Sequence, residues 1–262
     1  METKAPESTD AYRVVVFARP DDPAELAEVL HRVLGIHPTD ALVHARGAPG
    51  ALPEKLTRDR AEVLVAEIAQ LGLSAQALPA TEIPEFEHVV AVHRSACGDA
   101  GLDVQGLHDE QHFVVSWGDI ELIAIGQVPQ EVARHYATGE MAALSAARRT
   151  SKPPVDLPLP PGAAAWIVCR NPERELRIDH KRMNYEYLGK RKTFSATANF
   201  RLFVDDIISR TPHAYLTPST RDFLERGSVS SYSFDSPEKL KQDAILHLVI
   251  RRRSAAAVRG EN

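Results

Sequence analysis

The N-terminal fold is decided by the stretch YRVVVFARPDDPAELAEVLHRVLG, residues 12–35. Its β-branched, apolar start predicts a buried strand over residues 12–17. Asp22 followed by Pro23 is typical of a helix N-cap with proline at the first helical position. Apolar residues then recur at helical spacing until Gly35, a residue type that commonly ends helices. The stretch therefore predicts a strand followed by an amphipathic helix.

The residues that follow extend this pattern into a small domain. The further elements expected are a helix from His37-Pro38 to Gly47, a short strand at 51–56, a helix from its N-cap Thr57 to Gly72 and an edge strand at 74–78. These assignments rest on cap residues, glycine stops and the apolar period. We therefore expect a domain of order β-α-α-β-α-β over residues 11–80.

Residues 11–79 resemble a known fold. The segments YRVVVFARPDD, LAEVLHRVLGI, DAL and LTRDRAEVLVAEIAQLG are similar to the fold shared by the Clp protease adaptor and the C-terminal domain of the bacterial ribosomal stalk protein. The adaptor's substrate pocket uses an Asn-Asp-Asp turn after the first strand, where this chain has Arg19-Pro20-Asp21-Asp22. The resemblance therefore implies the fold, and no substrate-binding residue is carried over from it.

The rest of the chain, residues 85–262, has the pattern of an antiparallel β-rich domain with helices. A linker is expected at residues 79–84, where prolines disfavour helix. Strands are expected at 88–94, 101–105, 112–117, 120–128, 163–170 and 175–178, and helices at 129–149, after Ser195, after Thr217-Pro218 and after Ser236-Pro237. A proline-rich connection covers residues 150–162. The chain is thus expected to be α+β, and the layout of its second domain resembles that of pleckstrin-homology-like barrels.

Composition and charge limit the classes of protein to which the chain can belong. Its 262 residues are 44% hydrophobic and 26% charged, which is enough apolar sequence for packed cores. The net charge of -5 gives no overall attraction to nucleic acid or anionic lipid, which leaves that role to a local patch. No apolar run approaches the roughly 20 residues that cross a bilayer, and no signal-peptide pattern is present, so we expect a cytoplasmic protein. Cys97 and Cys169 are expected to be buried thiols.

Histidines and a cysteine gather in one stretch, and these residue types suit zinc. The residues are His88, His93, Cys97, His108 and His112. They do not form a paired, short-spaced ligand set, and His88 and His93, five residues apart on a strand, face opposite sides. Scattered surface or packing histidines are the favoured interpretation, and no metal is expected. A zinc-dependent enzyme that uses this stretch stays open as an alternative.

The sequence offers no other set of residues for catalysis. It has no G-x-S-x-G turn, and neither cysteine lies in a recognised nucleophile motif. Asp179 and His180 are adjacent in sequence and so point apart on a strand. Gly47-Ala48-Pro49-Gly50 lacks the lysine and the hydroxyl residue of a phosphate-binding loop. We therefore expect no catalytic residue and no cofactor.

The segment 170–194 is the best candidate for a binding surface. It combines cations with aromatic rings, a combination that can hold phosphates and stack bases. The candidate binding residues are Arg170, Arg177, Lys181, Arg182, Tyr185, Tyr187, Lys190 and Arg191. Nearby carboxylates dilute this charge, so a solvated hairpin with salt-bridged faces is the favoured alternative. The two tyrosines are equally open to packing in the core.

Two further expectations concern single residue types. Arg251, Arg252 and Arg253 are expected to follow the last helix, where cations meet the negative end of its dipole. Trp117 and Trp166 are expected to lie in the core.

Two expected domains without reaction chemistry favour a non-enzymatic binding or adaptor protein, whose partner is expected to be another protein. The first alternative is binding of nucleic acid, or of a phospholipid with a phosphoinositide-like anion, through residues 170–194. The second alternative is the zinc-dependent enzyme built on residues 88–112.

Overall fold

The computed structural model describes residues 11–86, 89–106, 112–129 and 161–259. Its N-terminal domain consists of β1 (Tyr12–Val16), α1 (Pro23–Leu34), α2 (Pro38–Gly47), β2 (Gly50–Ala51), α3 (Arg58–Gln70) and β3 (Ala75–Pro79). β1 is the central strand of a three-stranded sheet and pairs antiparallel with both β2 and β3. The predicted order β-α-α-β-α-β is confirmed.

The ends of the first helix follow from local chemistry. A side-chain oxygen of Asp22 accepts a hydrogen bond from Ala24 N (2.8 Å), which satisfies a free amide in the first turn of α1. Gly35 ends the helix with a φ of 71°, a conformation that glycine adopts without a steric cost. The core between the helices and the sheet includes Val14, Val16, Leu26, Leu30, Leu64 and Ile68.

The second domain is built on a seven-stranded sheet. Its strands are β4 (Val89–Cys97), β5 (Gly101–Gly106), β6 (His112–Ser116), β7 (Ile120–Val128), β8 (Gly162–Arg170), β9 (Glu173–Asp179) and β10 (Tyr215–Leu216). Across the sheet they follow the order β10-β7-β8-β9-β4-β5-β6. Because β10–β7 and β4–β9 are parallel pairs, the sheet is mixed, which corrects the antiparallel arrangement predicted for residues 85–262. Alternation within a strand sets its buried face but not its neighbour, so these pairs had no signal in the sequence.

Helices cover both faces of this sheet. They are α5 (Ala196–Arg210), α6 (Pro218–Leu224) and α7 (Pro237–Arg259). The described residues also form short 3-10 helices, namely η1 (Ala80–Glu82), η2 (Trp117–Asp119), η3 (Glu186–Arg191) and η4 (Val229–Tyr232). The hydroxyls of Ser195 and Thr217 cap α5 and α6, as their positions in the sequence predict. Helices and strands thus share the chain, and the predicted α+β class is confirmed.

The two faces of the seven-stranded sheet have separate cores. On one face, α5 packs Phe200 and Phe203 into a cluster that also holds Ile123. On the opposite face, the core of α7 and the sheet comprises Leu240, Ala244 and Leu248 of the helix with Leu122, Trp166 and Val168 of the strands. Trp166 is buried as predicted, whereas Trp117 is only half-buried at the edge of the first core.

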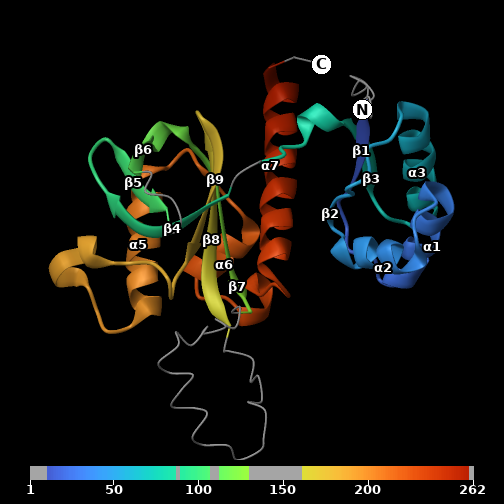
Figure 1. Ribbon diagram of the computed structural model, residues 1–262. Coiled ribbons are helices and arrows are strands. Elements are labelled where there is room, and N and C mark those ends of the chain that lie inside the picture. The colour runs from blue at the N-terminus through green and yellow to red at the C-terminus, as the bar shows by residue number, and fades with distance from the viewer. Residues whose placement is uncertain (1–10, 87–88, 107–111, 130–160, 260–262) are drawn as a thin grey trace, which may run out of the picture.

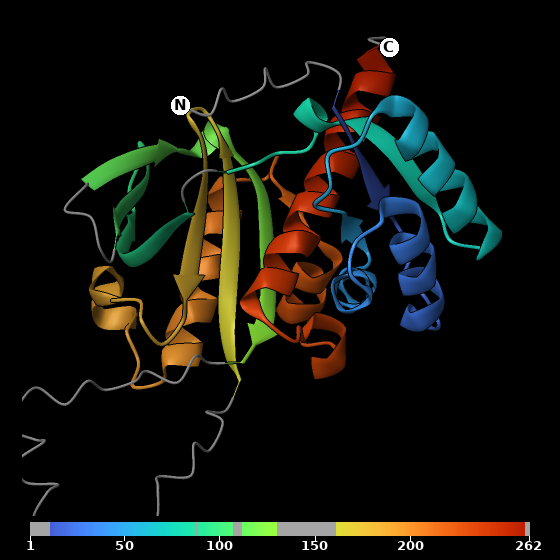
Figure 2. The ribbon, with the colours of Figure 1, turned by 45° about the vertical axis from the view of Figure 1, so that its right-hand side comes forward.

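α7 lies between the two sheets and contacts both of them (Figure 1, Figure 2). Toward the N-terminal sheet, Leu246 and Val249 of the helix pack with Val15 and Leu78. Within the expected linker, residues 79–84, Ile83 is buried in the same layer, whereas Thr81 and Glu82 are exposed. Both domains therefore pack against the same helix, α7.

The C-terminal arginines lie inside α7, which runs to Arg259. Their predicted position after the end of the last helix is wrong, because Ala255, Ala256 and Ala257 favour continuation of the helix. Arg252 instead bridges Glu121 and Glu173, each at 2.9 Å.

Some sequence predictions concern residues that the structure leaves undescribed. The helix expected at 129–149 lies outside the described residues apart from Pro129, and so does the connection at 150–162 apart from its last two residues. Among the described helices, none combines the length and the apolar character needed to cross a bilayer.

Candidate functional site

The tyrosines of the segment 170–194 belong to the protein interior. Tyr185 is 4% exposed, and its hydroxyl donates to His180 O (2.8 Å). The hydroxyl of half-buried Tyr187 donates to Asp206 Oδ2 (3.0 Å). Burial raises the pKa of both phenols above the ordinary value. Neither ring is therefore placed to stack on a base.

The arginines of this segment turn toward different parts of the molecule. Arg170 pairs with Glu121 (3.5 Å), and the guanidinium of Arg177 lies 5.7 Å from the ring centroid of Trp166. Arg191 makes two hydrogen bonds to Asp206 (2.9 and 2.6 Å), which lower the pKa of that carboxyl below its ordinary value. Because these partners lie on separate elements, the eight predicted residues do not form one surface.

A loop at the end of the segment is exposed to solvent. This basic loop, residues 189–195, carries the exposed cations Lys190 and Lys192 and the fully exposed ring of Phe194. Lys181 and Arg182 are also exposed, just after β9. Lys192 and Phe194 lie in the same segment but are not among the eight candidate residues predicted from the sequence. The combination of an exposed ring with cations is thus present, on other residues than the tyrosines.

The described residues of the histidine and cysteine stretch do not gather into a metal site. Nδ1 of His93 hydrogen-bonds a backbone carbonyl (3.0 Å), and His112 pairs with the carboxylate of Asp103. No three side chains able to hold a metal ion lie together within the described ranges, and His88 and His108 fall outside them. The zinc-dependent enzyme therefore stays a prediction, which elemental analysis of the purified protein tests.

Neither thiol is arranged as a nucleophile. Burial raises the pKa of Cys97 to about 11 and that of Cys169 to about 12. Both groups therefore stay protonated at neutral pH, whereas a reactive cysteine needs its thiolate.

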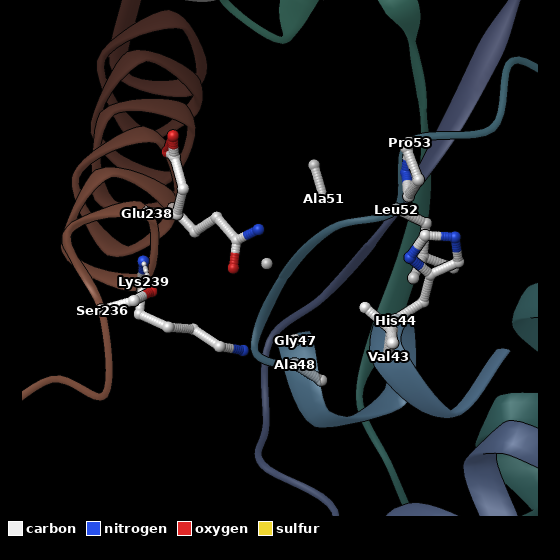
Figure 3. A pocket seen from close by; sticks show the side chains of 12 residues that line it. Val43, His44, Gly47, Ala48, Ala51, Leu52, Pro53, Ser236, Glu238 and Lys239 are labelled. Atoms are coloured by element: carbon white, nitrogen blue, oxygen red, sulfur yellow. Dashed lines mark hydrogen bonds between the residues drawn. The ribbon is translucent and has the colours of Figure 1, made fainter. Parts of the chain in front are cut away.

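A small pocket lies where the two domains meet (Figure 3). This junction pocket has a volume of about 140 Å³. Its lining residues are Val43, His44, Gly47, Ala48, Gly50, Ala51, Leu52 and Pro53 from the α2–β2 side and Ser236, Glu238, Lys239 and Gln242 from the start of α7. One wall is therefore mainly apolar and the other mainly polar.

Two polar side chains of the junction pocket, those of Lys239 and His44, are engaged within the protein. Lys239 Nζ donates to Arg46 O (2.5 Å) near the C-terminal end of α2, where a cation is favourable, and burial lowers the pKa of this lysine. His44 Nε2 lies 3.0 Å from Glu54 Oε1. A ligand in the pocket would therefore contact mainly the apolar wall.

Comparisons with known proteins assign no family. No protein-family model matches the sequence, and neither a curated protein nor a solved structure matches the chain. The resemblance of residues 11–79 to the fold of the Clp adaptor and the ribosomal stalk protein therefore stays a prediction. Function has to be argued from the sites themselves.

Proposed function

We propose that the chain is a non-enzymatic adaptor that binds a partner protein at the junction pocket. The observation that carries the proposal is the position of this pocket, between the α2–β2 segment and α7, where the two domains meet (Figure 3). Binding sites occur preferentially at domain interfaces, because two packed surfaces rarely match completely.

The size of the pocket indicates what it would accept. An apolar cavity of about 150 Å³ accommodates one benzene ring, and the junction pocket has nearly the same volume, about 140 Å³. A single apolar side chain of a partner is therefore the ligand that fits. Protein interfaces often depend on one such buried anchor, surrounded by a polar rim that excludes water. The polar groups of Glu238 and Gln242 supply that rim.

The chemistry of the described residues supports binding over catalysis. The thiols of Cys97 and Cys169 are held protonated, and His93 and His112 are each engaged by groups of the protein itself. General acid–base or nucleophilic catalysis needs such groups free to face a substrate.

Two variants that fill the junction pocket from opposite walls test this proposal. Gln242 is exposed on α7, and Gln242→Trp would cover the pocket from that side. A Cβ at Gly47 would lie 3.6 Å from Lys239 Nζ and 4.0 Å from Gln242 Oε1. The Cβ of Gly47→Met therefore makes no clash, and the rest of the methionine side chain can fill the pocket from the α2 side. Gln70→Trp, an exposed position on α3, makes the same exchange away from the pocket.

The measurement is capture of partners by the immobilised full chain, read by mass spectrometry. The proposal expects a protein that the wild type and Gln70→Trp retain and that both filled variants lose, with all four proteins unfolding at the same temperature. Identical capture by all four proteins, or no specific capture by the wild type, would overturn it.

A further inference from the structure

An exposed phenylalanine precedes α5. Phe194 is fully exposed, more than any other large apolar side chain in the described ranges. It directly precedes Ser195, the N-cap, and an apolar residue at that position often packs on the fourth helical residue. Here the fourth helical residue is Asn199, which is polar. Phe194 therefore has no apolar partner there and stays in solvent.

The backbone beside Phe194 is held in place by hydrogen bonds. Thr193 N donates to Asn199 Oδ1 (2.7 Å), and Asn199 Nδ2 donates back to Thr193 O (2.9 Å). Earlier in the basic loop, Arg191 is fixed by its two hydrogen bonds to Asp206. A ring that is already positioned loses less conformational entropy on binding than a ring on a free segment.

Cations lie close to this ring in the sequence. Lys190 and Lys192 are exposed, and neither forms an ion pair with any residue in the described part of the chain. The positive end of the α5 dipole lies beside them. The basic loop, residues 189–195, contains three cations and no carboxylate in a chain whose net charge is -5, and one of the three, Arg191, pairs with Asp206. Positive charge is therefore concentrated at the basic loop.

This combination fits a lipid surface better than a nucleic acid. Single-stranded nucleic acids are bound by stacking successive bases on several rings, but Tyr185 and Tyr187 are held in the interior and only Phe194 is fully exposed. A protruding apolar side chain with lysines beside it suits an anionic bilayer, since the ring enters between headgroups while the cations stay at the surface. We propose that the basic loop docks the protein on an anionic lipid bilayer, with Phe194 inserted and the two lysines on the headgroups.

This docking surface is independent of the junction pocket. The basic loop and the N-terminal domain lie on opposite sides of α7 (Figure 1, Figure 2). A protein docked by the loop therefore keeps its N-terminal domain away from the site of docking. The two proposals use different residues and are tested separately.

Vesicle sedimentation of the full chain tests the docking. We expect binding to phosphatidylcholine vesicles that contain phosphatidylserine, weaker binding as salt is raised, and little binding to phosphatidylcholine alone. Phe194→Ala is expected to weaken binding about tenfold through the lost apolar contact. Lys190→Gln and Lys192→Gln are each expected to weaken it about fivefold. The matched control, Arg58→Gln with Val63→Ala, removes an exposed cation and an exposed apolar side chain from α3 and should leave binding unchanged.

Insertion of the residue 194 ring into the bilayer is measured separately, by tryptophan fluorescence. In the F194W variant, fluorescence should be quenched by brominated lipid more strongly than in the wild type, whose Trp117 and Trp166 belong to the folded sheet domain. Absence of vesicle binding, equal binding with and without phosphatidylserine, or unchanged binding of Phe194→Ala overturns the proposal. Binding of a single-stranded RNA oligonucleotide through the same loop, without vesicle binding, also overturns it in favour of nucleic acid.

Discussion

The two sides of α7 hold their sheets by different means. Toward the seven-stranded sheet, the apolar layer is flanked by ion pairs whose carboxylates are almost completely buried. Lys241 lies 3.2 Å from Glu175, which is 0% exposed, and Arg252 lies 2.9 Å from Glu121, which is 5% exposed. Toward the N-terminal sheet, the layer is a smaller apolar cluster, and Arg253 pairs with Glu82 at the surface.

The two buried carboxylates differ in how well they are compensated. Burial raises the pKa of Glu175, and Lys241 only partly opposes this effect. Burial acts in the same direction on Glu121, but hydrogen bonds and charge from Arg252 and Arg170 bring its pKa below the ordinary value. Separating α7 from the seven-stranded sheet would expose the larger of the two apolar layers, in which each fully buried side chain contributes about 1.5–3 kcal/mol, whereas the ion pairs would become solvated and a surface ion pair contributes about 1 kcal/mol or less. We therefore expect the N-terminal domain to detach from α7 before α7 leaves its own sheet.

The largest expected effect is on the sheet side of α7. Leu248 is 0% exposed in the core with Trp166 and Val168. Leu248→Ala should lower the free energy of unfolding by about 3 kcal/mol, through lost burial and the cavity left behind. Urea titration followed by circular dichroism measures this change. Ile250→Ala, at a 38% exposed position on the same helix, is the control and should cost about 1 kcal/mol or less. Equal effects of the two variants would contradict the packing of Leu248 in the layer between α7 and the seven-stranded sheet.

The second prediction concerns the buried carboxyl group of Asp243 on α7. Burial raises the pKa of Asp243 to about 6, and its Oδ2 has no hydrogen-bond partner among the described residues. The unfolded value is about 3.9. Between these two pH values the folded chain keeps a proton on Asp243 that the unfolded chain releases, so the contribution of this group to stability is greatest below about pH 4 and is lost as pH rises through 6. His247, 3.6 Å away, has a pKa lowered by burial and does not offset this cost at pH 8.

Asp243→Asn therefore should stabilise the protein by about 2 kcal/mol at pH 8 and have almost no effect at pH 4. Denaturant titrations at both pH values give the comparison. Asp205→Asn, at an exposed position on α5, is the control for the loss of one negative charge. A loss of stability at pH 8 in Asp243→Asn would mean that the ionised carboxylate is satisfied after all.

The sequence was sufficient for the elements of the N-terminal domain because their signals are local. Asp22 and Gly35 mark the ends of α1 through contacts within a few residues, and the apolar period marks its buried side. The packing of α7 on both sheets also has a signal in the sequence, which a search for one apolar face of the helix misses. Leu240 and Leu248 lie on one side, whereas Leu246 and Val249 lie on another, and a helix that is apolar on two sides is buried on both.

The candidate sites were harder to foresee, because they depend on which side chains become buried. Tyr185 packs in the core and Phe194 is exposed, although both lie among cations in the same segment of the sequence. The polar Asn199 at the fourth position of α5 was the available signal for Phe194. The junction pocket joins residues almost two hundred positions apart, such as Gly47 and Lys239, so it follows from tertiary packing alone.

The smallest expected effect lies on the other side of α7. Val249 is 1% exposed in the layer with Val15 and Ile83, and Val249→Ala should weaken this layer by about 1 kcal/mol. If the N-terminal domain opens locally before the rest unfolds, a glutamate-specific protease will cut after Glu82 or Glu85 about fivefold faster in this variant. Val63→Ala, at an exposed position on α3, should leave the rate unchanged. Cleavage that accelerates only in parallel with global unfolding would show that both sheets leave α7 together, because the smaller apolar layer would then hold α7 as strongly as the larger one does.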